Sequence, residues 1–429
     1  MAIIQVTSET DAPDGVERAT AYGWIVFALS FGLLISDHMA RQVLNAVFPL
    51  LKAEWSLSDA ELGALSSVVA LMVGLLTFPL SLAADRWGRV KSLTLMAVLW
   101  SLATLLCAMA HSYRLMFFGR LLVGVGEAAY GSVGIAVVIA VFPARMRATL
   151  SSAFLAGSIF GQVIGVSVGG QIAATYGWRA AFLAIALSGL ALALLYPVVV
   201  RESRLGTKGR ASARTPMDLR ALPRQLFGSR AIVFAYLGSG LQLYTTGSLA
   251  AWLPSFFNRY HGMALDRAAQ LTAVYLLISG TGMILCGMLS DRVARDTPLA
   301  KVTLATGFAA TSGLFLALAF FSPPGTGQLV LLGFGVLMVA SVAGTSGAMV
   351  ANLTPQAIHG TAFATLALSN NLLGLAPGPI LTGKFADTLG LVGALRLVPL
   401  SCLLSAAMFL LARRTYLADL ERARSGGQG

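Results

Sequence analysis

The amino-acid sequence predicts an all-α integral membrane protein of twelve transmembrane helices, arranged as two pseudo-symmetric six-helix bundles. Apolar residues make up 57% of the 429 residues and charged residues only 11%, whereas about a quarter of a soluble domain is charged. A short pattern also occurs twice, as SLAADRWGR at 81–89 and as GMLSDRVAR at 287–295, each time where a long apolar segment ends. A repeat separated by nearly half the chain indicates two copies of one bundle.

Six apolar runs of about 20 residues, the length that crosses a bilayer as a helix, define the first bundle. Turn signals separate them, since Trp87-Gly88 follows the second run, Phe142-Pro143 the fourth and Tyr176-Gly177 the fifth. A polar and basic stretch then ends the bundle. The predicted helices lie at 22–51, 60–84, 91–111, 115–142, 148–174 and 179–200.

The second half repeats this arrangement, with turn signals at His261-Gly262, at the SPPG stretch 322–325 and at Thr354-Pro355. Its predicted helices lie at 229–258, 267–290, 298–321, 327–352, 360–385 and 391–412. The expected organisation is a leader at 1–21, a first bundle at 22–200, a basic linker at 201–228, a second bundle at 229–413 and a tail at 414–429.

Lysine and arginine residues set the orientation, because they gather on the cytoplasmic side of membrane proteins. With the N-terminus inside, the cytoplasmic loops, linker and tail hold about three times as many of them as the opposite side. Leader, linker and tail are therefore expected in the cytoplasm. Anionic lipid headgroups facing the basic linker account for the net charge of +12, so no nucleic-acid partner is needed.

Several classes of protein are disfavoured by missing patterns. The three cysteines, Cys107, Cys286 and Cys402, lie singly in apolar stretches, which predicts neither disulfides nor a metal site. No G-x-x-x-x-G-K-[ST], H-E-x-x-H or G-x-S-x-G pattern occurs, so neither ATP-driven transport nor catalysis is indicated. We expect no cofactor and no enzymatic activity.

The duplicated loop resembles that of the major facilitator superfamily, which carries G-x-L-A-D-R-x-G-R-K/R between its second and third helices. Asp85, Arg86, Gly88 and Arg89 match, whereas Ser81 replaces the first glycine and the last basic residue is shifted by one. The resemblance implies the twelve-helix fold and transport by alternating access. It assigns a gating role at the cytoplasmic mouth to Asp85, Arg86, Gly88, Arg89, Asp291 and Arg292.

Within that superfamily the chain most resembles the spinster-like lipid transporters. GVGEA at 124–128 resembles their fourth-helix stretch, MARQ at 39–42 their first-helix segment, and APGP at 376–379 their eleventh-helix ending. One position departs from the pattern: Ala40 stands where those relatives place an aspartate before the arginine, and an acid occurs one turn earlier, at Asp37. The resemblance implies an amphipathic, lipid-like substrate.

The first and fourth predicted helices together contain four charged residues, and a charged residue at membrane depth costs about 2.5–3.5 kcal/mol to insert. Asp37 and Arg41 are spaced i, i+4, and Arg120 and Glu127 are spaced i, i+7, so each pair shares one helix face. The resemblance places both helices around a central cavity. We expect Glu127 to carry the proton with Asp37 as its partner, Arg120 to tune Glu127, and Arg41 to pair with Asp37 or to bind an anionic group. Static ion pairs within each helix are the alternative.

The second bundle offers uncharged polar side chains instead. Tyr244, Gln242 and Asn370 are the candidate substrate contacts, and helix–helix hydrogen bonding is the alternative for each. The sequence thus predicts a monomeric, proton-coupled transporter of a small organic or amphipathic solute in the bacterial inner membrane, in contact with membrane lipids. An uncoupled facilitator, a spinster-like (lyso)lipid exporter and a receptor with a transporter fold remain as alternatives.

Overall fold

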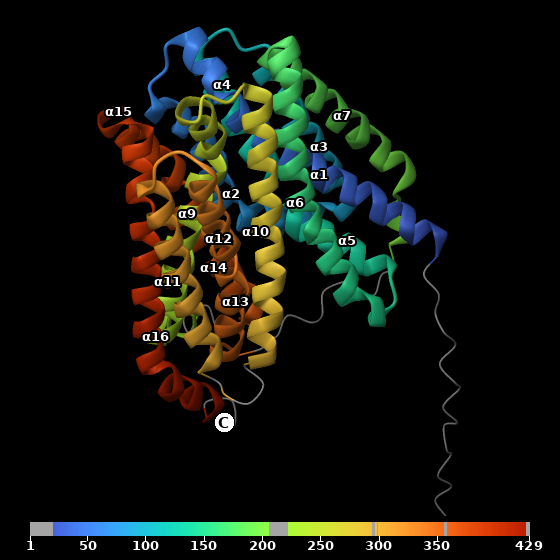
Figure 1. The fold of residues 1–429 in the computed structure, drawn as a ribbon. Coiled ribbons are helices and arrows are strands. Elements are labelled where there is room, and N and C mark those ends of the chain that lie inside the picture. The colour runs from blue at the N-terminus through green and yellow to red at the C-terminus, as the bar shows by residue number, and fades with distance from the viewer. Residues whose placement is uncertain (1–19, 206–221, 294–296, 298, 356–357, 426–429) are drawn as a thin grey trace, which may run out of the picture.

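The structure, a computed structural model, describes residues 20–205, 222–293, 297, 299–355 and 358–425. Most of the expected leader and linker lie outside this part, and so does the end of the tail. Every regular element in the described part is a helix, and the helices form the two groups that the repeat predicts (Figure 1).

The first group differs from the prediction in one respect, because its fourth predicted helix is divided. α4 ends at Glu127 and α5 begins at Tyr130, with a non-helical Ala129 between them (φ −113°, ψ 2°). Thr77 donates a hydrogen bond of 2.6 Å to the carbonyl of Ala128, which stabilises the break. The bounds are α1 Ala21–Trp55, α2 Asp59–Trp87, α3 Arg89–Ala108, α4 Tyr113–Glu127, α5 Tyr130–Val141, α6 Ala144–Tyr176, α7 Trp178–Val199 and η1 Glu202–Arg204.

The second group contains two similar interruptions. Its fourth predicted helix consists of α12 and α13, and its fifth passes through a π-helix, η4. α15 turns at Gly390, whose φ of 70° suits glycine. The bounds are α8 Leu222–Phe227, α9 Arg230–Tyr260, α10 Leu265–Val293, α11 Ala300–Phe321, α12 Thr326–Val339, α13 Val342–Leu353, α14 His359–Ser369, η4 Asn370–Leu375, α15 Pro377–Leu397 and α16 Pro399–Ser425.

The last helix continues beyond its expected end at residue 412, so most of the expected tail is helical. Asp419 in this extension accepts hydrogen bonds from the Ser229 hydroxyl (2.8 Å) and from the backbone N–H of Ala231 (3.0 Å). Its carboxylate therefore caps the N-terminus of α9, where a helix favours negative charge.

Ten helical stretches of the described residues are long and apolar enough to cross a membrane. α9 is not among them, because its polar residues lower its hydropathy although its 31 residues exceed the required length. Residues 359–423 count as one stretch that includes the turn at Gly390. The chain is therefore an all-helical, multi-pass membrane protein.

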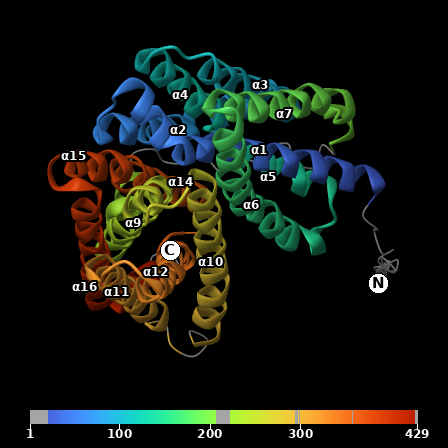
Figure 2. The ribbon, with the colours of Figure 1, turned by 45° about the horizontal axis from the view of Figure 1, so that its top comes forward.

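The two groups share a hydrophobic core at one end and have separate cores at the other. Phe48 of α1 and Trp252 of α9 have ring centroids 5.2 Å apart in a cluster built from both groups. At the other end, one cluster belongs to the first group and a second to the other group. α2 packs on α15 and α6 on α10 along the boundary, which Figure 2 shows from above. The lower ends of the groups diverge in Figure 1.

Candidate functional site

A buried ion pair joins α1 to α4. Arg41 donates to Oε2 of Glu127 from Nε at 3.0 Å and from Nη2 at 2.6 Å. The Glu127 side chain is completely buried, whereas that of Arg41 is 22% exposed. Helical spacing had suggested Asp37 as a partner of Arg41, but the structure pairs Arg41 with an acid from another helix. Arg41 thus connects a buried carboxylate to accessible space.

Among the described residues, Arg120 does not form the static intrahelical ion pair with Glu127 that was the alternative to its tuning role. Its buried guanidinium donates to the backbone carbonyls of Ala40 (2.8 Å), Leu65 (3.3 Å) and Arg41 (3.3 Å). These carbonyls belong to α1 and α2, so Arg120 ties α4 to both helices. Its main contribution is to hold the segment of α1 that carries Arg41.

Asp37 lies one turn before Arg41 and is buried, with 3% of its surface exposed. Its Oδ2 is 3.1 Å from Nδ1 of His38, which also lies 3.1 Å from the carbonyl of Leu34. Oδ1 of Asp37 has no hydrogen-bond partner within the described residues. A second buried carboxylate therefore stands beside the Arg41–Glu127 pair with one oxygen unsatisfied.

Gln242 occupies a different place from the one expected of a substrate contact. Its side chain is completely buried and donates to the Ser312 hydroxyl (3.0 Å) and the Val339 carbonyl (3.3 Å), on α11 and α12. It connects three helices inside the second group, which favours the alternative of helix packing, and its role as a substrate contact stays a prediction. Polarity in an apolar helix could not distinguish these two roles.

Tyr244 and Asn370 are only partly buried. The Tyr244 hydroxyl interacts with the side chains of Ser248 and Thr382. Asn370 opens the π-helix η4, and its Oδ1 has no partner in the described part of the chain. A single π-turn inside a longer helix is frequent at functional sites, because it redirects side chains and leaves backbone groups free. Asn370 remains a candidate contact.

The duplicated loops lie at the ends of α2 and α10, where the two groups have separate cores. Gly88 adopts a φ of 101°, which only glycine takes readily, and thereby connects α2 to α3. The Glu202 carboxylate accepts from the backbone N–H groups of Arg89 (3.0 Å) and Val90 (2.8 Å). Asp291 pairs with Lys301 at 3.4 Å. These contacts remain within their own groups.

The other expected gating residues are less constrained. Arg86 and Arg292 are exposed at the ends of their helices. Asp85 belongs to the last turn of α2, but its side chain is outside the described part of the structure. The gating role of all six loop residues stays a prediction.

Charged residues from both groups close the shared-core end. Asp59, at the start of α2, accepts from Lys52 (2.6 Å) and from Arg259 of the second group (2.8 and 2.9 Å). Asp387 of α15 accepts from the backbone N–H groups of Asp59 (2.6 Å) and Ala60 (3.0 Å). An acid of one group thus caps a helix of the other, which joins the two groups at this end.

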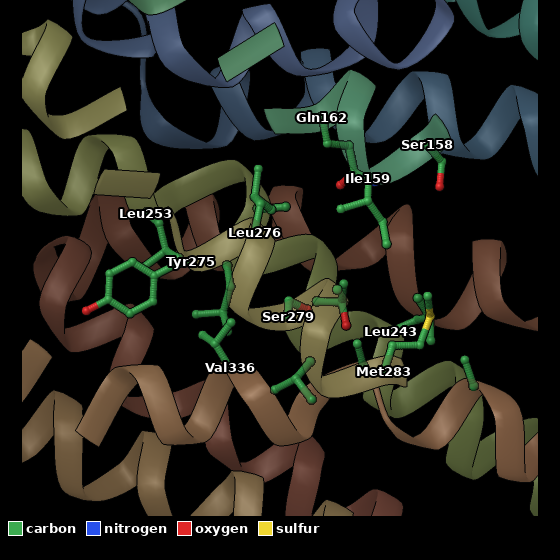
Figure 3. A pocket seen from close by; sticks show the side chains of 17 residues that line it. Ser158, Ile159, Gln162, Leu243, Leu253, Tyr275, Leu276, Ser279, Met283 and Val336 are labelled. Carbon is green, nitrogen blue, oxygen red and sulfur yellow. The ribbon is translucent and has the colours of Figure 1, made fainter. Parts of the chain in front are cut away.

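Each boundary between the groups also carries a pocket. One, of about 210 Å³, lies where α6 faces α9, α10, α12 and α13, and Figure 3 shows its side chains converging from both groups. The other lies between α2 and α14 and is lined by residues such as Leu75, Phe78 and Ala364. Both pockets are mainly apolar.

The comparison with protein families decides the assignment. The family model of the Major Facilitator Superfamily matches residues 29–379 of the chain. The chain belongs to the major facilitator superfamily. It is therefore a membrane transporter and not an enzyme.

Curated relatives of this transporter are themselves transporters. An uncharacterized transporter of Bacillus subtilis, YybO, is 24% identical over 87% of this chain and 90% of its own length. A probable L-galactonate transporter of Escherichia coli is 28% identical over 65% of each chain. The human protein spinster homolog 1 is 26% identical over 89% of this chain and 77% of its own length.

Solved structures support the fold of the transporter. A bacterial homologue of the human lysosomal transporter Spinster, in an inward-facing and occupied conformation, aligns with a TM-score of 0.83. It is 20% identical over 94% of this chain and 99% of that one. A D-xylose–proton symporter gives a TM-score of 0.72 at 20% identity, over 91% and 97% of the two chains. The resemblance to spinster-like transporters is thus confirmed.

Proposed function

We propose that this transporter moves an organic acid by alternating access and that Glu127 couples the movement to protons. The observation that carries the proposal is the pairing of a partly exposed Arg41 with a completely buried Glu127. A relative named as a probable L-galactonate transporter supports an acidic substrate. Twelve membrane-spanning helices, with both termini in the cytoplasm of a bacterial inner membrane, complete the proposal.

The proposed twelve spans are reached from the ten apolar stretches by adding one helix and by dividing one stretch into two. α9 has the length of a spanning helix, and the turn at Gly390 divides the stretch 359–423 into two spans. The excess of lysine and arginine in alternate loops supports cytoplasmic termini. The end closed by Asp59 and Arg259 then faces outward, and the described state is open toward the cytoplasm. One chain supplies both groups, in keeping with a monomer.

Competition for Arg41 supplies a physical basis for coupling. A carboxylate solute that pairs with Arg41 displaces the Glu127 carboxylate from its cation. An unpaired charge at a buried site is strongly disfavoured, by roughly 3–5 kcal/mol when one partner of a buried pair is removed. Protonation of Glu127 removes that charge. Solute binding therefore favours proton uptake, and the two move together.

Proteoliposomes containing a pH-sensitive dye test this function. Hexanoate and L-galactonate are added separately as an apolar and a hydroxylated carboxylate, and at least one of them is expected to drive proton movement with the wild type and to drive none with Glu127→Gln. Glu54→Gln is the matched control, because Glu54 is an exposed acid paired with Arg179 at a helix end. Solute uptake without any proton movement, in wild type and Glu127→Gln alike, would make the protein an uncoupled facilitator and contradict the proposal.

Export of a lipid-like molecule is the second candidate function. The apolar pockets at both boundaries favour it, and so does the similarity to protein spinster homolog 1. Its test is release of a labelled lysolipid from the same proteoliposomes. Such release, with no response to L-galactonate, would replace the organic-acid proposal.

A further inference from the structure

The pocket between α6 and α10 has an uncharged lining whose polar groups are largely occupied (Figure 3). The hydroxyls of Ser158, Thr246 and Tyr275 donate to the backbone carbonyls of Leu155 (2.7 Å), Gln242 (3.3 Å) and Leu329 (2.7 Å). The remaining wall is aliphatic and comes from both groups. The larger aliphatic and thioether side chains of the wall include those of Ile159, Leu243, Leu249, Leu276, Met283 and Val336.

Such a lining discriminates between hydrocarbon and hydroxylated solutes. Each CH₂ group removed from water contributes about 0.8 kcal/mol. A hydroxyl buried without a partner costs about 1–3 kcal/mol. Because most polar groups of the wall already donate to carbonyls, a sugar acid would lose hydrogen bonds to water and regain few. The pocket therefore favours an apolar body.

The volume limits the size of that body. A dry apolar cavity of about 150 Å³ holds benzene, whereas pockets for drug-sized ligands have about 300–1,000 Å³. At about 210 Å³, the α6–α10 pocket suits a group somewhat larger than a benzene ring.

The charged end of the solute must lie outside this lining. The α6 wall of the pocket contacts α1 through Gln162, whose Oε1 accepts from Nε2 of Gln42 at 3.3 Å. Arg41 is the preceding residue of α1 and is the partly exposed cation of the transport site. A carboxylate that extends from the pocket past Gln162 is thus directed toward the helix that carries this guanidinium, while its hydrocarbon part stays between α6 and α10.

We propose that the α6–α10 pocket receives the hydrocarbon part of a small amphipathic carboxylate, about six to eight carbons long, whose acid group is directed toward Arg41. The proposal rests on the proposed function, of which it names the substrate class. Both groups contribute to the wall, so a bound solute contacts both halves of the alternating-access machinery.

Matched acids test the proposal by calorimetry on the full-length protein in lipid nanodiscs. Hexanoate and gluconate have the same charge and six carbons, and they differ in five hydroxyl groups. Hexanoate and cyclohexanecarboxylate are expected to bind at least about tenfold more tightly than gluconate, since five unpartnered hydroxyls are disfavoured. Equal or tighter binding of gluconate overturns the proposal.

Filling the pocket provides the second measurement. Ser279→Phe is expected to weaken hexanoate binding at least about tenfold by occupying the volume, and Ala343→Phe, from the opposite wall, provides an independent version of the same change. Ala364→Phe fills the α2–α14 pocket and is the matched control, with no expected effect. Unchanged hexanoate binding in folded Ser279→Phe and Ala343→Phe proteins, or loss only in Ala364→Phe, overturns the proposal.

The outcomes also separate this proposal from the proposed function. If L-galactonate drives protons in a Glu127-dependent manner but hexanoate does not bind, the function stands and the pocket assignment falls. If hexanoate binds as described but no acid drives protons, the pocket assignment stands and the coupling falls.

Discussion

Buried charges account for most of the proposed chemistry at the scale of single residues. Where spinster-like relatives carry an aspartate, this chain has Ala40, which is 1% exposed and whose carbonyl accepts from Arg120 at 2.8 Å. The acid one turn earlier, Asp37, retains an unsatisfied Oδ1. Two carboxylates and one accessible arginine thus remain beside one another, which preserves the elements of a proton-linked anion site without an acid at position 40.

Replacement of Arg41 tests the ion pair directly. Arg41→Met leaves the Glu127 carboxylate buried without the cation that it pairs with. Removing one partner of a buried ion pair costs about 3–5 kcal/mol. We expect acid-driven uptake into proteoliposomes to fall at least about tenfold. Arg41→Lys retains the charge and is expected to recover part of the activity. Wild-type uptake by Arg41→Met would remove Arg41 from the transport site.

Close helix packing determines the geometry at the scale of elements. Gly157, Gly161, Gly165 and Gly169 of α6 face α1 so closely that a Cβ at each would touch an α1 residue. This stripe holds α1, which carries Asp37 and Arg41, against α6, which forms one wall of the α6–α10 pocket. Small residues permit such contact between membrane helices, and the glycine spacing of the sequence predicts it.

A side chain in this stripe should destabilise the first bundle. A Cβ at Gly165 would lie 2.7 Å from Cα of Met39, and such overpacking costs about 1–3 kcal/mol. Gly165→Leu is expected to lower the apparent Tm of the purified protein by several degrees. Gly307→Leu on α11, where a Cβ meets nothing within 4 Å, is the control and should change it little. Equal Tm values for both variants would contradict the packing argument.

Alternating access belongs to the scale of the whole molecule. The two groups share a core only at the end where Asp59, Arg259 and Asp387 meet, and the opposite ends diverge (Figure 1). Opening the closed end requires that these contacts separate. Because they are charged and lie across the boundary between the bundles, we expect them to contribute to the balance between the two states.

Neutralising the cap on α2 should shift this balance toward the state open at that end. The interaction of a carboxylate with a helix N-terminus contributes about 1–2 kcal/mol in a partly buried setting. Weakening it by Asp387→Asn is equivalent to about a 5–30-fold change in the ratio of the two states. Ser67→Cys places a single cysteine on α2 in a background without other cysteines. With Asp387→Asn this cysteine is expected to react faster with an impermeant maleimide than it does when Asp387 is present. Glu202→Gln, which alters a cap within one bundle, is the control. Equal labelling in both variants would show that Asp387 does not hold this end closed.

The duplicated loops should act in the opposite state. Asp85→Asn is expected to reduce transport while expression and membrane insertion remain normal, because the acid is proposed to latch the bundles where they now diverge. Uptake, normalised to the inserted protein, measures the effect. Normal uptake by a properly inserted variant would remove Asp85 from the gate.

The sequence pattern was sufficient to predict the repeated helical bundles, but it predicted few of the contacts inside the site. Hydropathy located most helices within a few residues, but not the extension of α16 to Ser425 or the interruptions after Glu127 and at η4. Those depend on bonds from distant residues, such as that of Thr77 to Ala128. Gln242 shows the same limit, since its polarity predicted a substrate contact and its neighbours on α11 and α12 use it for packing.

The sequence by itself determined the membrane-embedded helical class, the duplication and the four charged residues within the first and fourth predicted helices, because apolar length, repeats and spacing are properties of the local chain. Only the tertiary structure decided that Arg41 pairs with Glu127, that Arg120 binds backbone carbonyls, and that Asp59 and Asp387 close one end. Those partners lie between 55 and 328 residues apart. Which charge meets which is set by how the helices pack, and helical periodicity contains no information about neighbours on other helices.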